Sequence, residues 1–331
     1  MKRPWGKLLA LSLGLFLFLW ILRQVGFEET FAQVRKVGWS FPFLLLPSVV
    51  MALFFSIGWW LTLRPGVSLA QTFLTRAAGE AVNLITPMAY MGGEPLKASL
   101  LRRLGIPLTD GLASVVVTKT MTTLGYCLFI FLGLASALPR TQEFNSALLG
   151  GLGAGLFLAL SVLVLYYGQT RGMFSLLHRL SHRLGARGEA WMAKREGLEV
   201  LDGKIATLYR TRRPLVGCLL FSLLGWLTSA VEAYVFLWAM GSRVDVSTAI
   251  VIQALLLGVK AATFFIPANL GAQEGGTVLI FLGLGISAET ATAFSLLRRA
   301  REITWVTIGL LVLTRTGWPA FVGQAEGERG S

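Results

Sequence analysis

The sequence predicts an all-α polytopic membrane protein, with about six full spanning helices and two re-entrant hairpins, broken by Pro and Gly, arranged as an inverted repeat. Of its 331 residues, 54% are hydrophobic and only 14% are charged, whereas a soluble domain carries roughly 25% charged residues. Several apolar runs approach the roughly 20 residues that a spanning helix needs. These features predict a single transmembrane domain over 1–321 and a disordered, Gly- and Glu-rich tail over 322–331.

The full spans are expected in six apolar runs: 5–22, 41–63, 112–138, 147–167, 215–240, and 303–313 with its preceding turns. The first run is too long and too aromatic for a cleaved secretory signal, so we expect it to be retained. Basic residues precede it, and the segment 168–213 carries ten Lys and Arg against four acids. Because basic loops stay on the cytoplasmic side, we expect a multi-pass protein of the cell (cytoplasmic) membrane with both termini in the cytoplasm.

The segment 168–213 is the one sizeable soluble piece of the chain. Within it, apolar residues from Trp191 to Leu208 recur at helical spacing with basic residues between them. This pattern is typical of an amphipathic helix, expected either on the cytoplasmic interface or against a partner protein. The net charge of +13 follows the membrane topology, so it predicts affinity for anionic lipid headgroups rather than for nucleic acid.

Two segments, 67–106 and 247–286, do not fit simple spanning helices. Each has a helical stretch, a Pro/Gly interruption, and a shorter stretch that ends in Leu-Gly-Ile. Shifting the chain by 180 residues superposes Pro87 on Pro267, Glu94 on Glu274, Leu104-Gly105-Ile106 on Leu284-Gly285-Ile286, and Lys119 on Arg299. We interpret the repeat units as lying around 67–138 and 247–314.

The order of the spans indicates how the two units are oriented. If the first hairpin enters and leaves from the cytoplasm, three further spans place the second hairpin on the opposite face. Inverted repeats with discontinuous helices that meet near the bilayer midplane are an architecture of transporters. The alternative is that 248–266, which is nearly all apolar, spans fully, and in that case the units are not inverted.

A cluster of charged residues is predicted near mid-membrane depth. Lys119 lies about ten residues into its helix, and Arg298, Arg299 and Arg301 lie at a similar depth in theirs. A charge at this depth costs at least ~2.5 kcal/mol, so it should face a cavity or an internal partner. One interpretation is ion pairing alone: Glu94 with Lys119, Glu274 with Arg299, and Glu302 with a neighbouring arginine. The other is that part of the cluster binds an anionic headgroup, helped by free N–H groups at the half-helix N-termini.

Candidate substrate-binding residues are therefore the charged and amide side chains of these segments: Lys119, Arg298, Arg299, Arg301, Glu94, Glu274, Asn83 and Asn269. The helix-breaking positions are Pro87, Gly92, Gly93, Pro267, Gly271 and Gly275. Glu94 and Glu274 are expected either to orient the opposite cation or to titrate during transport, and the sequence leaves both roles open.

Signatures of enzymes are absent from the sequence. It contains no His-Glu-x-x-His, no Gly-x-Ser-x-Gly, no P-loop and no aspartate-rich metal motif. His178 and His182 lie among arginines without a nearby carboxylate or thiol, so we interpret them as part of a solvated basic face. We expect no catalytic residue, no metal and no cofactor.

The motifs around the breakers are similar to those of the flippase-like family. They are Gly79-Glu80-Ala81-Val82-Asn83-x-x-x-Pro87, Gly92-Gly93-Glu94-Pro95-x-Lys97, Ile266-Pro267-x-Asn269-x-Gly271-x-x-Glu274-Gly275 and Leu297-Arg298-Arg299. Members share the transmembrane domain of lysylphosphatidylglycerol synthases, and some are associated with hopanoid lipid pathways. The resemblance covers nearly the whole chain, which has Ala268-Asn269 where the family often shows Pro-Gly or Gly-Gly. It implies a lipid translocase with two re-entrant hairpins but without the aminoacyl-transfer domain of the synthases.

The expected function is therefore that of a flippase-like transporter that moves an amphipathic lipid, with an anionic headgroup, between leaflets. The alternative is a non-enzymatic accessory subunit that binds or presents lipids to a partner enzyme of lipid metabolism. A membrane-embedded lipid transferase is a third possibility, which the shortage of acids at membrane depth disfavours.

Overall fold

The computed structural model describes residues 35–63, 65–85, 92–137, 145–176, 189–263, 266 and 269–316. Within these ranges the chain forms helices and turns, without strands. The first predicted span, Pro87, Pro267, the His178/His182 pair and the C-terminal tail lie outside the described residues. The all-α prediction is confirmed.

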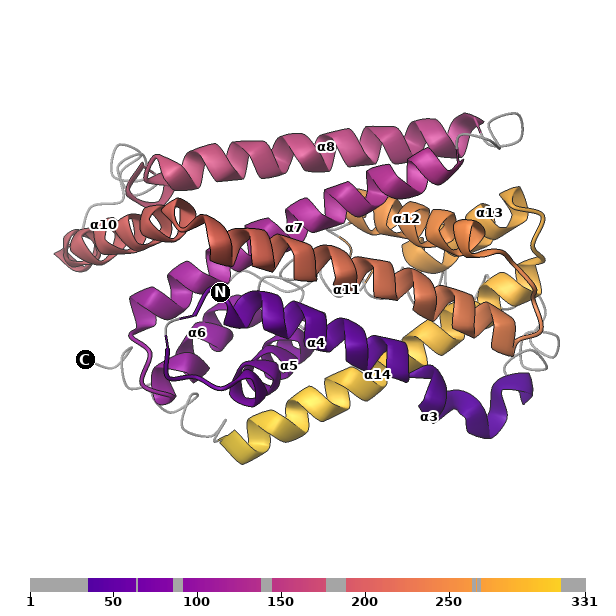
Figure 1. Ribbon diagram of the computed structural model, residues 1–331, viewed down its shortest axis with the longest axis horizontal. Coiled ribbons are helices and arrows are strands. Elements are labelled where there is room, and N and C mark those ends of the chain that lie inside the picture. The colour runs from indigo at the N-terminus through magenta and orange to yellow at the C-terminus, as the bar shows by residue number, and fades with distance from the viewer. Residues whose placement is uncertain are drawn as a thin grey trace.

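Twelve labelled elements follow one another along the described chain: η1 (Gly38–Ser40), α3 (Phe41–Leu44), α4 (Leu46–Trp60), α5 (Leu69–Ile85), α6 (Gly93–Arg103), α7 (Leu108–Ala137), α8 (Asn145–Thr170), α10 (Glu189–Arg210), α11 (Arg212–Ala239), α12 (Val246–Ala262), α13 (Ala272–Gly283) and α14 (Ala288–Thr316). The long helices α4, α7, α8, α11 and α14 run roughly along the longest axis of the molecule (Figure 1). The hairpin of α5 and α6 lies toward the left end of this view, and the hairpin of α12 and α13 lies toward the right end.

The helix boundaries reproduce the 180-residue register. The helices α6 and α13 end at Arg103 and Gly283, and α7 and α14 begin at Leu108 and Ala288. The turns between them also match, because Gly105 and Gly285 have φ of 88° and 71°. Ile106 N–H donates to Leu101 O at 3.1 Å, and Ile286 N–H donates to Phe281 O at 2.8 Å. Both turns are therefore glycine-dependent helix ends of the same type, which needs a residue that tolerates positive φ.

The two units pack crosswise. The helix that follows the first hairpin, α7, packs against α12, and the helix that follows the second hairpin, α14, packs against α5. Small residues allow close approach: a Cβ on Gly133 would lie 2.1 Å from Ala254 Cβ, and one on Gly309 would lie 2.4 Å from Ala77 O. Interfaces of small residues are typical of helices that pack in membranes. In Figure 1, α7 runs from left to right and α14 from right to left.

The largest buried cluster joins α7, α11, α12, α13 and α14. Phe236, Phe281 and Phe294 are fully buried within it, and their rings pack edge to face or tilted at centroid distances of 5.2 to 6.0 Å. Aromatic packing thus holds α13, the second helix of the second hairpin, against α14, and α14 against α11. The two cysteines, Cys127 and Cys218, are both buried and free.

The spans expected from sequence are supported to different degrees. Among the described residues, three segments are long and apolar enough to cross a membrane: Arg35–Trp60, Leu108–Ala137 and Arg212–Ala239. The helices α8 and α14 have 26 and 29 residues, and α14 carries charges near its middle. At 17 residues, α12 measures about 25 Å along its axis, which is shorter than the roughly 30 Å hydrocarbon core.

The amphipathic helix predicted within 168–213 corresponds to α10. Its apolar face packs on the same chain, because Leu201 and Ile205 are buried against Ala113 and Val117 of α7. Lys204 of α10 forms an ion pair of 2.8 Å with Asp110 at the start of α7. The described part of the helix is therefore a packed element of the fold, with Leu201 and Ile205 facing α7.

Replacing Asp202 of α10 is expected to loosen this end of the molecule. Its carboxylate accepts the N–H groups of Phe174 and Ser175, at 3.2 and 2.8 Å, and the Ser175 hydroxyl at 2.5 Å. We expect Asp202→Ala to cost about 1–2 kcal/mol, as the loss of a helix cap does, and Asp202→Asn to cost less because one acceptor remains. Thermal unfolding of the purified proteins in detergent would rank the stabilities of the parent, Asp202→Asn and Asp202→Ala. If both variants are as stable as the parent, the prediction is wrong.

Candidate functional site

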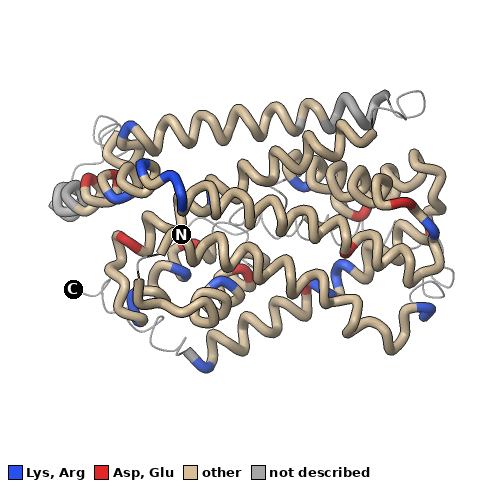
Figure 2. Tube along the Cα trace, viewed as in Figure 1, with Lys and Arg blue, Asp and Glu red and all other residues tan. Residues whose placement is uncertain are grey.

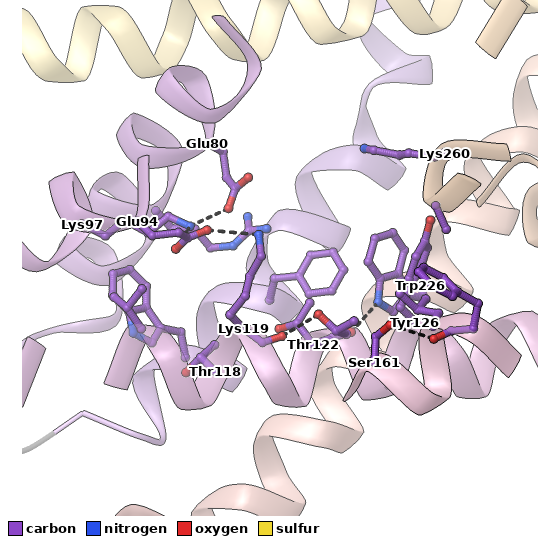
Figure 3. A pocket seen from close by; sticks show the side chains of 18 residues that line it. Glu80, Glu94, Lys97, Thr118, Lys119, Thr122, Tyr126, Ser161, Trp226 and Lys260 are labelled. Carbon is purple, nitrogen blue, oxygen red and sulfur yellow. Dashed lines mark hydrogen bonds and ion pairs between the residues drawn. The ribbon is translucent and has the colours of Figure 1, made fainter. Parts of the chain in front are cut away.

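A cavity of about 480 Å³ opens beside the first hairpin. Its described wall comes from α4, α5, α6, α7, α8, α11 and the C-terminal end of α12. This volume lies in the range of ordinary small-ligand sites, roughly 300–1,000 Å³. One part of the wall is charged and another part is aromatic, as Figure 3 shows.

The charged part is an alternating chain of two carboxylates and two ammonium groups. Lys97 Nζ lies 2.7 Å from Glu80 Oε1 and 3.0 Å from Glu94 Oε2, and Lys119 Nζ lies 3.1 Å from Glu94 Oε1. Lys97 is buried, whereas 45% of the Lys119 side chain is exposed. Lys119 reaches from α7 toward the hairpin (Figure 3), so it is the one of these four residues that a ligand can contact most freely. We call these four residues the first network.

Asn83 holds the two arms of the first hairpin together. Its Oδ1 accepts the N–H of Gly93, at the start of α6, at 2.7 Å, and its Nδ2 donates to Glu94 Oε1 at 3.1 Å. Asn83 is 1% exposed. The side chain therefore caps the half-helix and orients Glu94, and it does not reach the cavity.

The apolar part of the wall is built from aromatic rings on three long helices. Trp226 of α11 packs against Phe55 at 5.1 Å and against Tyr126 at 4.9 Å between ring centroids. The Trp226 indole N–H donates to Thr122 O at 3.2 Å, and the Tyr126 hydroxyl donates to Leu257 O at 2.5 Å. These contacts satisfy the polar atoms of both rings, so their faces form a fixed apolar surface.

A second network surrounds the other hairpin. Arg299 lies 2.7 Å from both Glu274 Oε1 and Glu302 Oε2, and Arg301 lies 2.6 Å from Glu232 Oε2. These side chains are at most 17% exposed. Charged residues thus occur in the middle of long helices as well as at their ends (Figure 2). The pairs Glu94–Lys119 and Glu274–Arg299 both join residues 25 positions apart, as the 180-residue register requires.

The ion pairs proposed from sequence are therefore present: Glu94 with Lys119, Glu274 with Arg299, and Glu302 with Arg299 and, at 3.8 Å, Arg301. Of the candidate substrate-binding residues, Glu94 and Lys119 line the cavity. Arg298, Arg299, Arg301 and Glu274 lie in or beside the second network, outside the cavity wall. Arg298 is buried, donates to Gln253 at 3.5 Å, and lies 5.8 Å from the Phe294 ring centroid.

The second hairpin turn is also held by its own side chains. Glu274 Oε2 accepts the N–H of Gly271 at 2.7 Å, and Asn269 Oδ1 accepts the Thr263 hydroxyl at 2.9 Å. Asn269 is fully buried with φ of 50°. The N–H groups of Gly93 and Gly271 are therefore occupied by internal acceptors. This corrects the expectation that these particular donors are free for a phosphate.

Four charged residues of the cavity wall were missed by sequence reasoning: Arg76, Glu80, Lys97 and Lys260. All four are charges inside otherwise apolar segments, which is the signal that could have selected them. Lys260, near the end of α12, points into the cavity from the side opposite Lys97 (Figure 3). It also lies within electrostatic range of Glu80 of the first network and Glu302 of the second. Through Lys260, the second hairpin also contributes to the wall of this cavity.

Comparison with known families matches residues 7–310 to the lysylphosphatidylglycerol synthase transmembrane region. The chain belongs to this family. A UPF0104 membrane protein of Methanothermobacter thermautotrophicus is 24% identical over 277 residues, which cover 77% of this chain and 78% of the relative. No solved structure matches the chain. The family match confirms the resemblance drawn from the breaker motifs and identifies a multi-pass membrane protein.

Metal ligation is not suggested by the described part of this family member. No group of three or more His, Cys, Asp or Glu residues there could hold a metal ion. The chemistry that the site offers is ionic and hydrogen-bonding at one end and apolar at the other.

Proposed function

We propose that the protein is a lipid translocase, which moves an amphipathic lipid with an anionic headgroup between the leaflets of the cell membrane. The observation that carries the proposal is the two-part wall of the cavity. Cationic side chains at one end can bind a phosphate group, and fixed aromatic faces at the other end can bind the start of an acyl or prenyl chain. This arrangement suits a molecule that is itself amphipathic, and it involves no covalent step.

The crosswise packing of the two units supports an inverted repeat. Hairpins at opposite ends, followed by helices that run in opposite directions, are what an axis in the membrane plane would produce. We propose that the end with α10 faces the cytoplasm, because the exposed arginines Arg171, Arg210, Arg212 and Arg213 gather there and basic loops stay inside. We also propose that both termini are cytoplasmic, because basic residues precede the first apolar run.

Lys119 gives a direct test of the translocase proposal. We expect Lys119→Gln to lower the initial rate of lipid translocation at least tenfold, because the exposed cation that would contact the headgroup is removed while the ion pair of Lys97 with Glu94 remains. The rate would be measured in liposomes containing acyl-labelled fluorescent lipids, as the fraction that becomes accessible to a membrane-impermeant quencher. Arg210→Gln, an exposed charge change at the end of α10, is the matched control and should keep the parental rate.

Two outcomes would contradict this proposal. If the reconstituted protein translocates no anionic lipid with or without an ion gradient, it is not a translocase by itself. If cells that carry Lys119→Gln in place of the parent protein grow normally, the cationic end of the cavity is not needed for function. The accessory-subunit alternative is then favoured. Product formation from a lipid carrier by the purified protein would instead indicate a transferase.

A further inference from the structure

Four half-buried hydroxyl side chains also line the cavity, and the proposed function has not yet used them. They belong to three threonines of α7 and one serine of α8: Thr118, Thr122, Thr123 and Ser161. Along α7, Thr122 and Thr123 lie between Lys119, at the charged end of the wall, and Tyr126, at the aromatic end. Figure 3 shows labelled hydroxyl side chains from both helices on this wall. We call the four hydroxyl groups the hydroxyl belt.

Two members of the belt have already donated their hydrogen to their own helix. The Thr123 hydroxyl donates to Lys119 O at 2.8 Å, and the Ser161 hydroxyl donates to Phe157 O at 2.8 Å. A hydroxyl group has a single hydrogen to donate but two lone pairs with which to accept. Both groups therefore present their oxygen to the cavity as an acceptor.

The other two members reach the same state through a neighbouring hydroxyl. Thr118 lies 3.0 Å from the Thr62 hydroxyl, which already donates to a backbone carbonyl at 2.7 Å. Thr122 lies 3.4 Å from the Ser222 hydroxyl, which also donates to a backbone carbonyl at 2.7 Å. Because Thr62 and Ser222 have no second hydrogen, Thr118 and Thr122 are the donors in these contacts. All four belt oxygens are thus left as acceptors.

The ligand that complements this wall has an acceptor group beside donor groups. Lys119 and Arg76 can only donate, so they match the oxygens of a phosphate. The hydroxyl belt accepts, so it matches O–H groups carried next to that phosphate. Resting on the translocase function proposed above, we propose that the hydroxyl belt is a subsite for headgroup hydroxyls, and that the cavity selects anionic phospholipids with a polyol headgroup.

The deciding experiment compares phosphatidylglycerol with phosphatidylpropanol of identical acyl chains. The two lipids have the same charge and the same headgroup carbon skeleton, and they differ only in the headgroup hydroxyls. Native mass spectrometry of the detergent-solubilised protein, titrated with each lipid, measures both affinities. We expect phosphatidylglycerol to bind about fivefold more tightly, the effect of roughly one additional hydrogen bond. Equal affinities would overturn the proposal.

An ammonium group also donates hydrogen bonds, so phosphatidylethanolamine is the second comparison. We expect it to bind more weakly than phosphatidylglycerol, because it lacks the net negative charge that the exposed Lys119 attracts. Tighter binding of phosphatidylethanolamine would assign the belt to an ammonium group and overturn the polyol assignment.

The double variant Thr123→Val with Ser161→Ala connects the preference to the belt. Each hydroxyl bonds only to its own helix, so its removal breaks no contact between helices, and thermal unfolding would verify that the variant is folded. The preference for phosphatidylglycerol should fall below about twofold, with the affinity for phosphatidylpropanol unchanged. An unchanged preference would contradict the role of the belt.

Matched controls remove hydroxyl groups of the same kind outside the described cavity wall. Ser136 of α7 and Thr228 of α11 donate to carbonyls of their own helices at 2.9 and 2.8 Å, and both are exposed. The double variant Ser136→Ala with Thr228→Val should keep the parental preference. Loss of the preference in this control would show that the belt does not set it.

A soluble polyol phosphate shares the headgroup chemistry, so the apolar part of the wall has to be tested as well. A lipid also uses the faces of Tyr126 and Trp226, whereas glycerol 3-phosphate uses only the polar groups. If the ligand is a lipid, millimolar glycerol 3-phosphate should lower the binding of phosphatidylglycerol less than about twofold. Full displacement would assign the site to the soluble compound and overturn the lipid assignment.

Failure of the subsite can be separated from failure of the translocase function, because binding is measured without transport. Tighter binding of phosphatidylglycerol without translocation of any lipid would reject the translocase function and retain the subsite. Equal binding of phosphatidylglycerol and phosphatidylpropanol, with both lipids translocated, would reject the subsite and retain the translocase function.

Discussion

Gly93→Ala is expected to prevent the first hairpin from closing and to yield little folded protein. A Cβ at this position would lie 1.9 Å from Gly79 O and 2.7 Å from Gly79 C. These are backbone atoms of the opposite arm, which a rotamer change cannot displace. Separating the arms would also break the hydrogen bond from Gly93 N–H to Asn83 Oδ1. We expect a loss of more than about 3 kcal/mol, at the upper end of what overpacking costs.

Expression level and thermal unfolding of the detergent-solubilised variant would measure this effect. The matched control is Gly153→Ala, because a Cβ on Gly153 of α8 meets nothing within 4 Å. In that open helical position, alanine should be neutral or stabilise by up to about 1 kcal/mol. If Gly93→Ala is as stable as Gly153→Ala, the two arms are not in the close contact described here.

Arg299→Met should be the most damaging single charge removal in the second network. Arg299 neutralises Glu274 and Glu302 at the same time, each at 2.7 Å, and the Glu274 side chain is only 3% exposed. Removing one partner of a buried pair leaves an uncompensated charge, which typically costs 3–5 kcal/mol. Arg301 can compensate Glu302 only weakly, because it lies 3.8 Å away and already pairs with Glu232.

The double variant Arg299→Met with Glu274→Gln provides the internal test. Removing both charges should recover a large part of the loss, because replacing a buried pair costs much less than breaking it. Arg315→Met, an exposed position near the end of the same helix, should change the unfolding temperature little. If the double variant is less stable than Arg299→Met alone, the unpaired Glu274 carboxylate is not the cause of the stability lost in Arg299→Met.

The two networks have different roles in the proposed mechanism. The second network is buried and, with Arg298 beside it, neutral, so we interpret it as the element that holds α13 against α14. The first network is neutral as well, but it borders the cavity, and Lys119 is 45% exposed there. The cavity is also lined by Arg76 and Lys260, which belong to different hairpins. Ligand binding would therefore draw on both units of the repeat.

Several features could be predicted because they are local in the sequence. The Leu-Gly-Ile turns indicated where α6 and α13 end, since only a glycine easily adopts the positive φ that these helix ends require. The 180-residue register indicated the partner of Glu94 and of Glu274. Both predictions needed only the spacing of residues along the chain, because a helix, a turn and the next helix are positioned by the backbone between them.

The membership of the cavity could not be predicted in the same way. Arg298 and Arg301 have the same sequence signal as Lys119, namely a cation near the middle of an apolar helix, yet they are absent from the cavity wall. Arg76 was not selected from the sequence, although its side chain lines the cavity. Which face of a long helix turns toward a cavity depends on the neighbouring helices, and these come from distant parts of the chain.

The sequence by itself determined the all-α membrane class, the two broken segments, their common register and the pairing of Glu94 with Lys119 and of Glu274 with Arg299. Only the tertiary structure decided that one network borders a cavity while the other is packed away, and that Asn83 caps a helix. It also decided that Arg76 and Lys260 line the same cavity. The physical reason is that apolar burial and local turns follow from neighbours in sequence, whereas a cavity exists only where helices distant in sequence fail to fill the space between them.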